Sequence, residues 1–242
     1  MKRFVLLAVI AAMATAGFFH EVPAFAKVLG EYKMVLILPG PINDQSWNAT
    51  NYAGLQAVNK TLGTKMEYVE NVQASDYEST FRNYAERGYD LIMAAGTQFD
   101  EPASRVAPKY PKTVFCVVNG MAAAGPNVMP ILPKEYEASF LAGIIAGHVT
   151  KSGKIGIAGG FPNKLMIRLL NTYEWAARVG RSDLKVTRAY ANSWSDVALG
   201  KQMASSMIDG GADVLFFYAN QVGLGAIQAA KEKGVKYIGF AS

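Results

Sequence analysis

The chain has 242 residues, of which 51% are hydrophobic and 18% charged, a composition that excludes an intrinsically disordered protein and allows a sizeable core. The length suits two domains or one large α/β domain. Its 24 basic residues only mildly exceed the 19 acidic ones and form no cluster, so the charge pattern gives no support for a nucleic-acid partner.

The first residues have the pattern of a secretory signal peptide. A positive start is followed by an apolar stretch that is too short and too rich in Ala for a membrane span, and then by Ala24-Phe25-Ala26. We therefore predict a signal peptide over residues 1–26, cleaved before Lys27. The single cysteine, Cys116, lies in an apolar run far from the signal and predicts a buried thiol without a disulfide partner, not a lipid anchor. The mature chain is expected to be periplasmic or secreted and not membrane-embedded.

Residues 34–38 begin the first structural unit. They form an uninterrupted aliphatic run, typical of a strand buried on both faces of a parallel sheet, which Pro39-Gly40-Pro41 ends. Helical spacing follows over residues 46–62, with Gly63 at the expected C-cap. The loop over residues 42–48 would thus lie at the carboxyl end of a strand, where open α/β sheets bind ligands.

This loop carries polar groups and one large aromatic ring, contributed by Asn43, Asp44, Trp47 and Asn48. Such a set can bind a small polar ligand with a flat apolar part. For an isolated loop, however, capping of the helix by Asp44 or Ser46 and core packing of Trp47 explain these residues better than ligand contact does. The loop alone does not establish a site.

Strand and helix patterns alternate along the rest of the chain. Further strands are predicted at residues 65–69, 91–94, 113–118, 129–132, 154–158, 185–190, 214–218 and 235–240, and helices at residues 76–87, 103–110, 135–149, 163–179, 198–209 and 225–233. This alternation predicts parallel, doubly wound sheets. The series restarts after Pro133, so we predict an N-terminal α/β lobe over residues 27–133 and a C-terminal α/β lobe over residues 134–242, with a cleft between them. Gly143 and Gly147 are spaced for close helix packing.

The residues that enzymes use most are scarce or have simpler explanations. His148 is the only histidine after the predicted leader and falls near the end of a helix, which argues against a catalytic triad or a His-based metal site. Asp100 and Glu101 precede Pro102 and fit a helix N-terminus as well as acid/base work. Lys164 and Arg168 share a helix face and could meet an anion, although a solvated face explains them better. We predict neither an enzyme nor a cofactor.

Several long segments resemble one family. They are INDQSWN at residues 42–48, EASFLAGIIAGHVTKSGKIGIAGG at 137–160, NSWSDVALGKQMASSMIDGGADVLF at 192–216 and GLGAIQAAKEKGVKYIGFAS at 223–242. Together they are similar to the basic membrane protein family, the nucleoside-type solute-binding proteins of ABC importers. The resemblance implies a periplasmic-binding-protein type I fold, in which two Rossmann-like lobes close on a purine nucleoside or related ligand. It also implies an ABC transporter permease as partner.

The resemblance assigns roles to individual residues. The aromatic position that stacks the base in the family falls on Trp47, and second-lobe amides could read the edge of the base. The predicted ligand site consists of Asn43, Asp44, Trp47, Asn48, Phe99, Asp100, Tyr218, Asn220 and Gln221.

One position departs from the family. Many relatives that bind a ribose have an Asp where this chain has Ala241, which favours a free nucleobase or another flat heterocycle over a nucleoside. The family's further C-terminal segment, which crosses back to the first lobe, is also expected to be missing, so we expect a truncated second lobe. A sugar-binding protein of the same fold and a ligand-sensing receptor component remain alternative functions.

Overall fold

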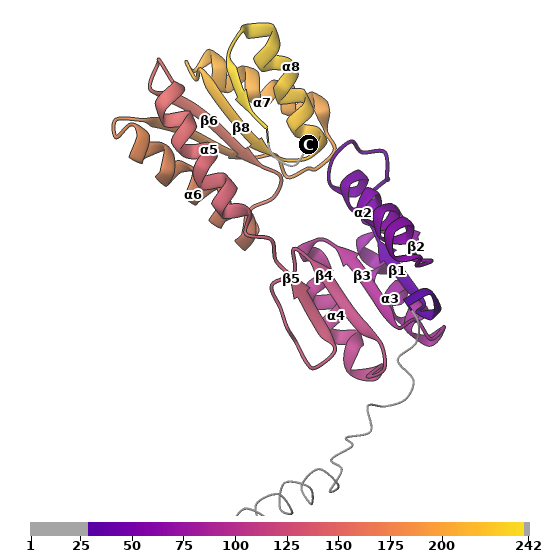
Figure 1. Cartoon of the computed structure of the whole chain (residues 1–242). Coiled ribbons are helices and arrows are strands. Elements are labelled where there is room, and N and C mark those ends of the chain that lie inside the picture. Colours follow the sequence, from indigo (N-terminus) through magenta and orange to yellow (C-terminus); the bar gives the residue numbers. More distant parts are fainter. Residues whose placement is uncertain (1–28, 240–242) are drawn as a thin grey trace, which may run out of the picture.

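The computed structural model describes residues 29–239 and contains two α/β lobes (Figure 1). The predicted leader and Ala241 lie outside the described residues. We call the part that carries β1 to β5 the first lobe and the part from α5 to β9 the second lobe. The two meet between β5 and α5, which brackets the predicted boundary at residue 133; the assignment of separate domains stays a prediction.

The first lobe is built on a five-stranded parallel sheet of order β2-β1-β3-β4-β5. Its strands are β1 (Met34–Ile37), β2 (Glu67–Val69), β3 (Leu91–Ala95), β4 (Val114–Val118) and β5 (Val128–Ile131). Its helices are α2 (Trp47–Leu62), α3 (Tyr77–Glu86) and α4 (Asp100–Val106), with short 3-10 turns at Leu29–Glu31, Ala74–Asp76, Thr97–Phe99 and Ala107–Lys109. The predicted fold class is confirmed by this sheet and by its counterpart in the second lobe.

The second lobe has a four-stranded parallel sheet of order β7-β6-β8-β9. The strands are β6 (Lys154–Gly159), β7 (Lys185–Tyr190), β8 (Val214–Tyr218) and β9 (Lys236–Ile238), and the helices are α5 (Glu135–Val149), α6 (Lys164–Gly180), α7 (Val197–Asp209) and α8 (Gln221–Lys233). Helices α5 and α6 pack on one face of the sheet and α7 and α8 on the other. Alternate residues of β8 therefore enter two different cores, as Phe216 and Phe217 do.

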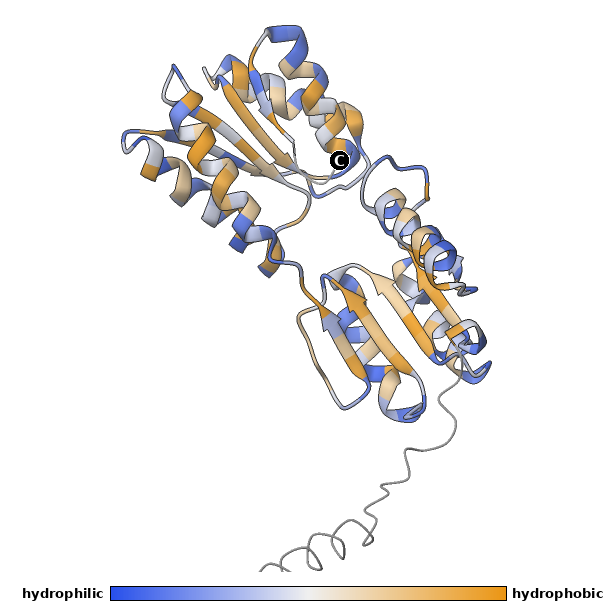
Figure 2. Cartoon of the chain, in the orientation of Figure 1, coloured by the Kyte–Doolittle hydropathy of each residue, from blue (hydrophilic) through white to orange (hydrophobic). Residues whose placement is uncertain are grey.

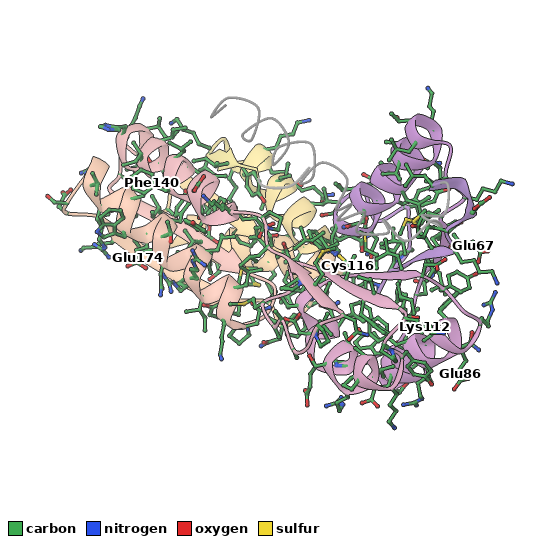
Figure 3. All side chains as sticks on the ribbon, turned by 60° about the horizontal axis from the view of Figure 1, so that its bottom comes forward. Glu67, Glu86, Lys112, Cys116, Phe140 and Glu174 are labelled. Carbon is green, nitrogen blue, oxygen red and sulfur yellow. The ribbon has the colours of Figure 1, made fainter. Side chains whose placement is uncertain are left out.

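The sheet of the first lobe is covered less evenly. Helices α3 and α4 pack on one face, where Phe81 and Phe115 are fully buried. On the other face α2 contributes Leu55 to a core with β1. At the far edge, Met129 and Ile131 of β5 are 46% and 40% exposed, and the strands remain strongly hydrophobic there (Figure 2). Cys116 is buried in β4 as predicted (Figure 3), and burial raises the pKa of its thiol to about 11.

Glycines allow two helices of the second lobe to touch. A Cβ atom added at Gly143 would lie 2.3 Å from the carbonyl oxygen of Tyr173, and one at Gly147 would lie 2.2 Å from that of Ala177. Neither approach is possible for a larger residue without moving α5 away from α6. The predicted close packing is confirmed.

Two helices begin earlier than the sequence pattern predicts. Helix α4 begins at Asp100 instead of residue 103, because Pro102 occupies its first turn, where no intrahelical N–H is needed. Helix α8 begins at Gln221 instead of residue 225. Gly225 is a poor helix former but lies where α8 meets α7, since a Cβ there would be 1.9 Å from the carbonyl oxygen of Val197.

Candidate functional site

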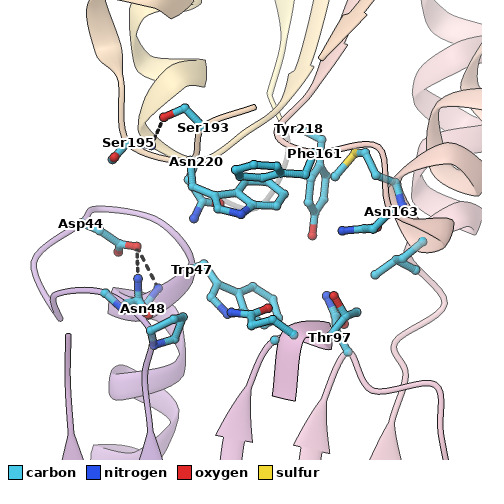
Figure 4. Close-up of a pocket in the computed structure, with 18 of the residues that line it drawn as sticks. Asp44, Trp47, Asn48, Thr97, Phe161, Asn163, Ser193, Ser195, Tyr218 and Asn220 are labelled. Carbon is cyan, nitrogen blue, oxygen red and sulfur yellow. Dashed lines mark hydrogen bonds between the residues drawn. The ribbon is translucent and has the colours of Figure 1, made fainter. Parts of the chain in front are cut away.

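A cavity of about 1210 Å³ lies between the lobes, at the carboxyl ends of both sheets (Figure 4). Loops and helix N-termini from both lobes line it, as expected for the crevice of open α/β sheets. The first lobe contributes Pro39, Gly40, Pro41, Asp44, Trp47, Asn48, Asn71, Tyr77, Gly96, Thr97, Gln98, Asp100, Asn119, Met121 and Ala122. The second contributes Phe161, Asn163, Lys164, Leu165, Met166, Asn192, Ser193, Trp194, Ser195, Tyr218, Asn220 and Gln221.

Asp44 holds the loop over residues 42–48 in shape. Its carboxylate accepts hydrogen bonds from the backbone N–H groups of Ser46, Asn48 and Ala49 at 2.9 to 3.0 Å, and from the side-chain amide of Asn48 at 2.8 Å. Asn48 in turn accepts from the N–H of Gly40 at 3.3 Å. The carboxylate satisfies free donors at the start of α2, so its capping role is clear even though it reaches the cavity wall.

Trp47, the first residue of α2, supplies the aromatic surface of the first-lobe wall (Figure 4). Its indole N–H donates to the carbonyl oxygen of Ala95 at 3.0 Å, which ties the ring to the end of β3. The remaining ring surface packs partly on the α2 core and partly faces the cavity. The hydrogen bond therefore fixes the plane of the ring before any ligand arrives.

Two residues of the predicted site do not reach the cavity. Asn43 is exposed at the loop tip and does not contribute to the lining. Phe99 is fully buried in the core, where its ring centroid lies 4.2 Å from that of Tyr77 and 5.9 Å from that of Phe81. The 3-10 turn over Thr97–Phe99 directs the ring back under the sheet, so the structure corrects the assignment of Phe99 to the ligand.

Asp100 does line the cavity and is only partly satisfied. Its Oδ2 accepts from the backbone N–H of Met121 at 2.8 Å, whereas its buried Oδ1 has no hydrogen-bond partner in the protein. Burial raises the pKa of this carboxyl, and hydrogen bonds from the backbone of Met121 and Ala122 oppose the rise.

Three predicted second-lobe residues also line the cavity. Tyr218 ends β8, and its hydroxyl donates to Glu135 at 2.9 Å; burial and the nearby Glu135 carboxyl hold its pKa well above the ordinary value. Asn220, just before α8, combines φ 47° with ψ −124°, a strained conformation outside the left-handed α region that Asn tolerates. Gln221 begins α8, and its N–H donates to the carbonyl oxygen of Trp194 at 3.0 Å.

Sequence reasoning missed the aromatic wall of the second lobe. Phe161 follows β6 and Trp194 follows β7, and their ring centroids are 5.5 Å apart. A Cβ at Gly160 would lie 2.2 Å from the Trp194 ring, so this Gly allows the ring to lie across the loop. A sequence signal for this wall was present, because Gly160 and Phe161 directly follow β6, just as the loop over residues 42–48 follows β1.

The remaining candidate residues from the sequence are two basic side chains and one histidine. Lys164, expected on a solvated face, lies at the cavity rim, while the Arg168 guanidinium lies 3.9 Å from the centre of the Tyr136 ring. His148 is exposed in the last turn of α5. Within residues 29–239, no three His, Cys, Asp or Glu side chains gather in a way that could hold a metal ion.

A comparison with known protein families identifies the family of this chain. The profile of the PnrA-like ABC transporter substrate-binding proteins, the Bmp family, matches residues 32–242. The chain belongs to this family. Its members are described as substrate-binding proteins, not enzymes.

Curated relatives agree with this membership. The chain is 34% identical over 194 residues to the ABC transporter nucleoside-binding protein BmpA of Lactococcus lactis, an alignment that covers 78% of this chain and 55% of that protein. It is 29% identical over 213 residues to basic membrane protein B of Borreliella burgdorferi, with 85% of this chain and 62% of the relative covered. The chain thus spans about three fifths of the length of these relatives.

Solved structures show the same fold. An ABC transporter solute-binding protein of Aeropyrum pernix superimposes with a TM-score of 0.79 at 24% identity, covering 86% of this chain and 61% of that one. The glucose-galactose binding protein GanP of Geobacillus stearothermophilus gives 0.69 at 19% identity, covering 86% and 77%. GanP is named for sugars and the relative BmpA for nucleosides, so the fold alone does not identify a ligand. Among the described residues, no helix has the length and apolar character that crossing a membrane requires.

Proposed function

We propose that this protein is the extracytoplasmic substrate-binding component of an ABC importer and binds a purine nucleobase or nucleoside between its lobes. The observation that carries the proposal is the pair of aromatic walls: Trp47 on the first lobe and Phe161 on the second lobe face the same cavity (Figure 4). A planar heterocycle between such rings buries both of its faces and gains about 0.5–1.5 kcal/mol per aromatic pair beyond the area term.

Polar groups around the walls suit the edges of such a heterocycle. Asn163 is a clear case, because its Oδ1 accepts from the backbone N–H of Met166 at 2.9 Å and caps α6. Its side-chain N–H groups therefore remain to donate at the cavity edge. Family membership and the nucleoside-binding relative of Lactococcus lactis support the same ligand class.

The proposed cycle needs no chemistry on the ligand. Closure of the two lobes buries the ligand, and the closed form is the state that a permease would recognise. We place the protein outside the cytoplasm and assign residues 1–26 as its export signal.

Binding can be tested directly by isothermal titration calorimetry and thermal unfolding with purine bases, nucleosides, pentoses, hexoses and amino acids. We expect purines to bind and to raise the unfolding temperature, since a ligand at a hundred times its Kd stabilises by about 2.7 kcal/mol. Binding of sugars alone would keep the fold assignment and overturn the proposed ligand.

Replacing Trp47 by Ala should weaken purine binding by about 10- to 100-fold, because one stacking face is lost. Trp47→Phe should retain most of the affinity. Trp175, which is 60% exposed on α6 and outside the cavity, provides the matched control. Equal affinities for Trp47→Ala and Trp175→Ala would remove Trp47 from the binding site.

A further inference from the structure

Asn220 occupies a turn position that suits Gly. The turn lies between β8 and α8, and the N–H of Val222 closes it by donating to the carbonyl oxygen of Ala219 at 3.0 Å. Asn220, with φ 47° and ψ −124°, has the backbone of the first central position of a type II′ turn, where Gly fits without strain. Strained conformations of this kind persist only where the surrounding structure fixes them, and they cluster at functional sites.

Backbone contacts on both sides hold this turn in place. The N–H of Gln221 donates to the carbonyl oxygen of Trp194 at 3.0 Å. The carbonyl oxygen of Val222 lies against α7, since a Cβ added at Gly200 would be 1.9 Å from it. The turn therefore cannot relax without moving α8 away from α7. These contacts use only backbone atoms of the turn, so Gly at position 220 would make them equally well.

Capping of α8 does not explain the side chain of Asn220 either. Helices α6 and α7 are capped by Asn163 and Asp196, whose extended backbones let each side chain accept from a first-turn N–H at 2.9 Å. Asn220 precedes α8 in the same way, but its side chain forms no capping hydrogen bond and finds no other partner within residues 29–239. Its partly exposed amide lies at the cavity instead (Figure 4).

We propose that Asn220 is a specificity-determining residue, and that the strained turn aims its amide at the edge of the ligand. The inference rests on the proposed function and sharpens it. A side-chain amide offers an N–H donor beside a carbonyl acceptor, a pair that matches the amino group and N7 of adenine. Unsubstituted purine lacks the amino group, so the site prefers adenine. Sites that hydrogen-bond a ligand group discriminate against analogues without it.

Asn220→Gly separates the amide from the backbone that carries it. Gly relieves the strain, so we expect the unfolding temperature of the ligand-free protein to rise by about 2–4 °C. The same change removes the amide. Calorimetry should therefore show adenine binding about tenfold more weakly, while the affinity for purine stays within about twofold. Stability and adenine affinity are expected to move in opposite directions.

Gln45→Gly is the matched control. Gln45 also carries an amide on a backbone with positive φ (54°), but it is exposed on the first lobe and does not line the cavity. This variant should leave both affinities unchanged.

Three outcomes for Asn220→Gly would overturn the proposal while the proposed function stands. Unchanged adenine affinity would remove the amide from the ligand. Equal weakening of adenine and purine would show that the amide does not recognise the amino group. A lower unfolding temperature would show that the side chain serves the fold. If no purine binds the unchanged protein, the proposed function fails as well.

Discussion

The two lobes are built from the same strand and helix unit, yet they bury it differently. In the second lobe, helix pairs cover both faces of the sheet, and every residue of β8 is buried. In the first lobe, one face is covered only over part of its width, and β5 exposes Met129 and Ile131. Parallel sheets are normally buried on both faces. The same sequence pattern of apolar strands therefore carries different energetic weight in the two sheets.

The largest contrast should come from strand residues. Phe216 is fully buried and stacks on Tyr173 with ring centroids 4.3 Å apart, so Phe216→Ala should lower the free energy of unfolding by about 3–5 kcal/mol. Met129→Ala in β5 should change it by no more than about 0.5 kcal/mol. Urea unfolding of both variants measures the difference. Similar losses would show that the exposed face of the first sheet is packed in solution.

A smaller contrast should come from helix glycines. Gly147→Ala places a methyl group against the backbone of α6 and should destabilise the second lobe by about 1–3 kcal/mol. Gly54 in α2 has open space around it, and Gly54→Ala should instead stabilise the first lobe by about 0.5–1 kcal/mol. Thermal unfolding of the two variants should move in opposite directions; movement in the same direction would contradict the close packing of α5 on α6.

The smallest contrast concerns acid stability. Asp213 of the second lobe accepts hydrogen bonds from the Thr150 hydroxyl at 2.5 Å and from the N–H groups of Lys151 and Ser152 at 2.7 and 2.9 Å. Burial opposes ionisation, but these bonds outweigh it and lower the pKa of the carboxyl. Because this pKa is lower in the folded state, the ionised carboxylate stabilises the fold at pH values above the unfolded-state pKa of about 4. This stabilisation is lost as the pH falls through the folded-state pKa.

Asp213→Asn should therefore cost about 1–2 kcal/mol near neutral pH, with a difference from the unchanged protein that shrinks as the pH falls towards 3. Unfolding curves across this pH range measure it. Asp76→Asn is the control, because Asp76 is exposed in the first lobe and its side chain does not cap α3. A pH-independent difference for Asp213→Asn would remove the ionised carboxylate as the cause.

The sequence predicts the strands and the position of the cleft because short apolar runs end at Gly or Pro, as β1 ends before Pro39. The first residues of helices are harder to predict from sequence. Gly225 has a low helix propensity, but it allows α8 to pack closely on α7, a contact that exists only in the folded chain. The site shows the same division. The strand-end loops and the family resemblance together predict that Trp47 and Tyr218 face the cleft. They do not distinguish Phe99, which is buried in the core, from Phe161, which lines the cavity.

The hydrogen bond from the indole of Trp47 to the carbonyl oxygen of Ala95 affects how the fluorescence of the protein can be used. Two of the three tryptophans, Trp47 and Trp194, have rings at the cavity, and the third, Trp175, lies exposed on α6. Replacing Trp175 by Phe would leave fluorescence only from indoles whose emission depends on what fills the cleft. The protein thus contains its own spectroscopic reporter, with an emitter held at a fixed angle so that quenching records occupancy of the cavity rather than motion of the ring.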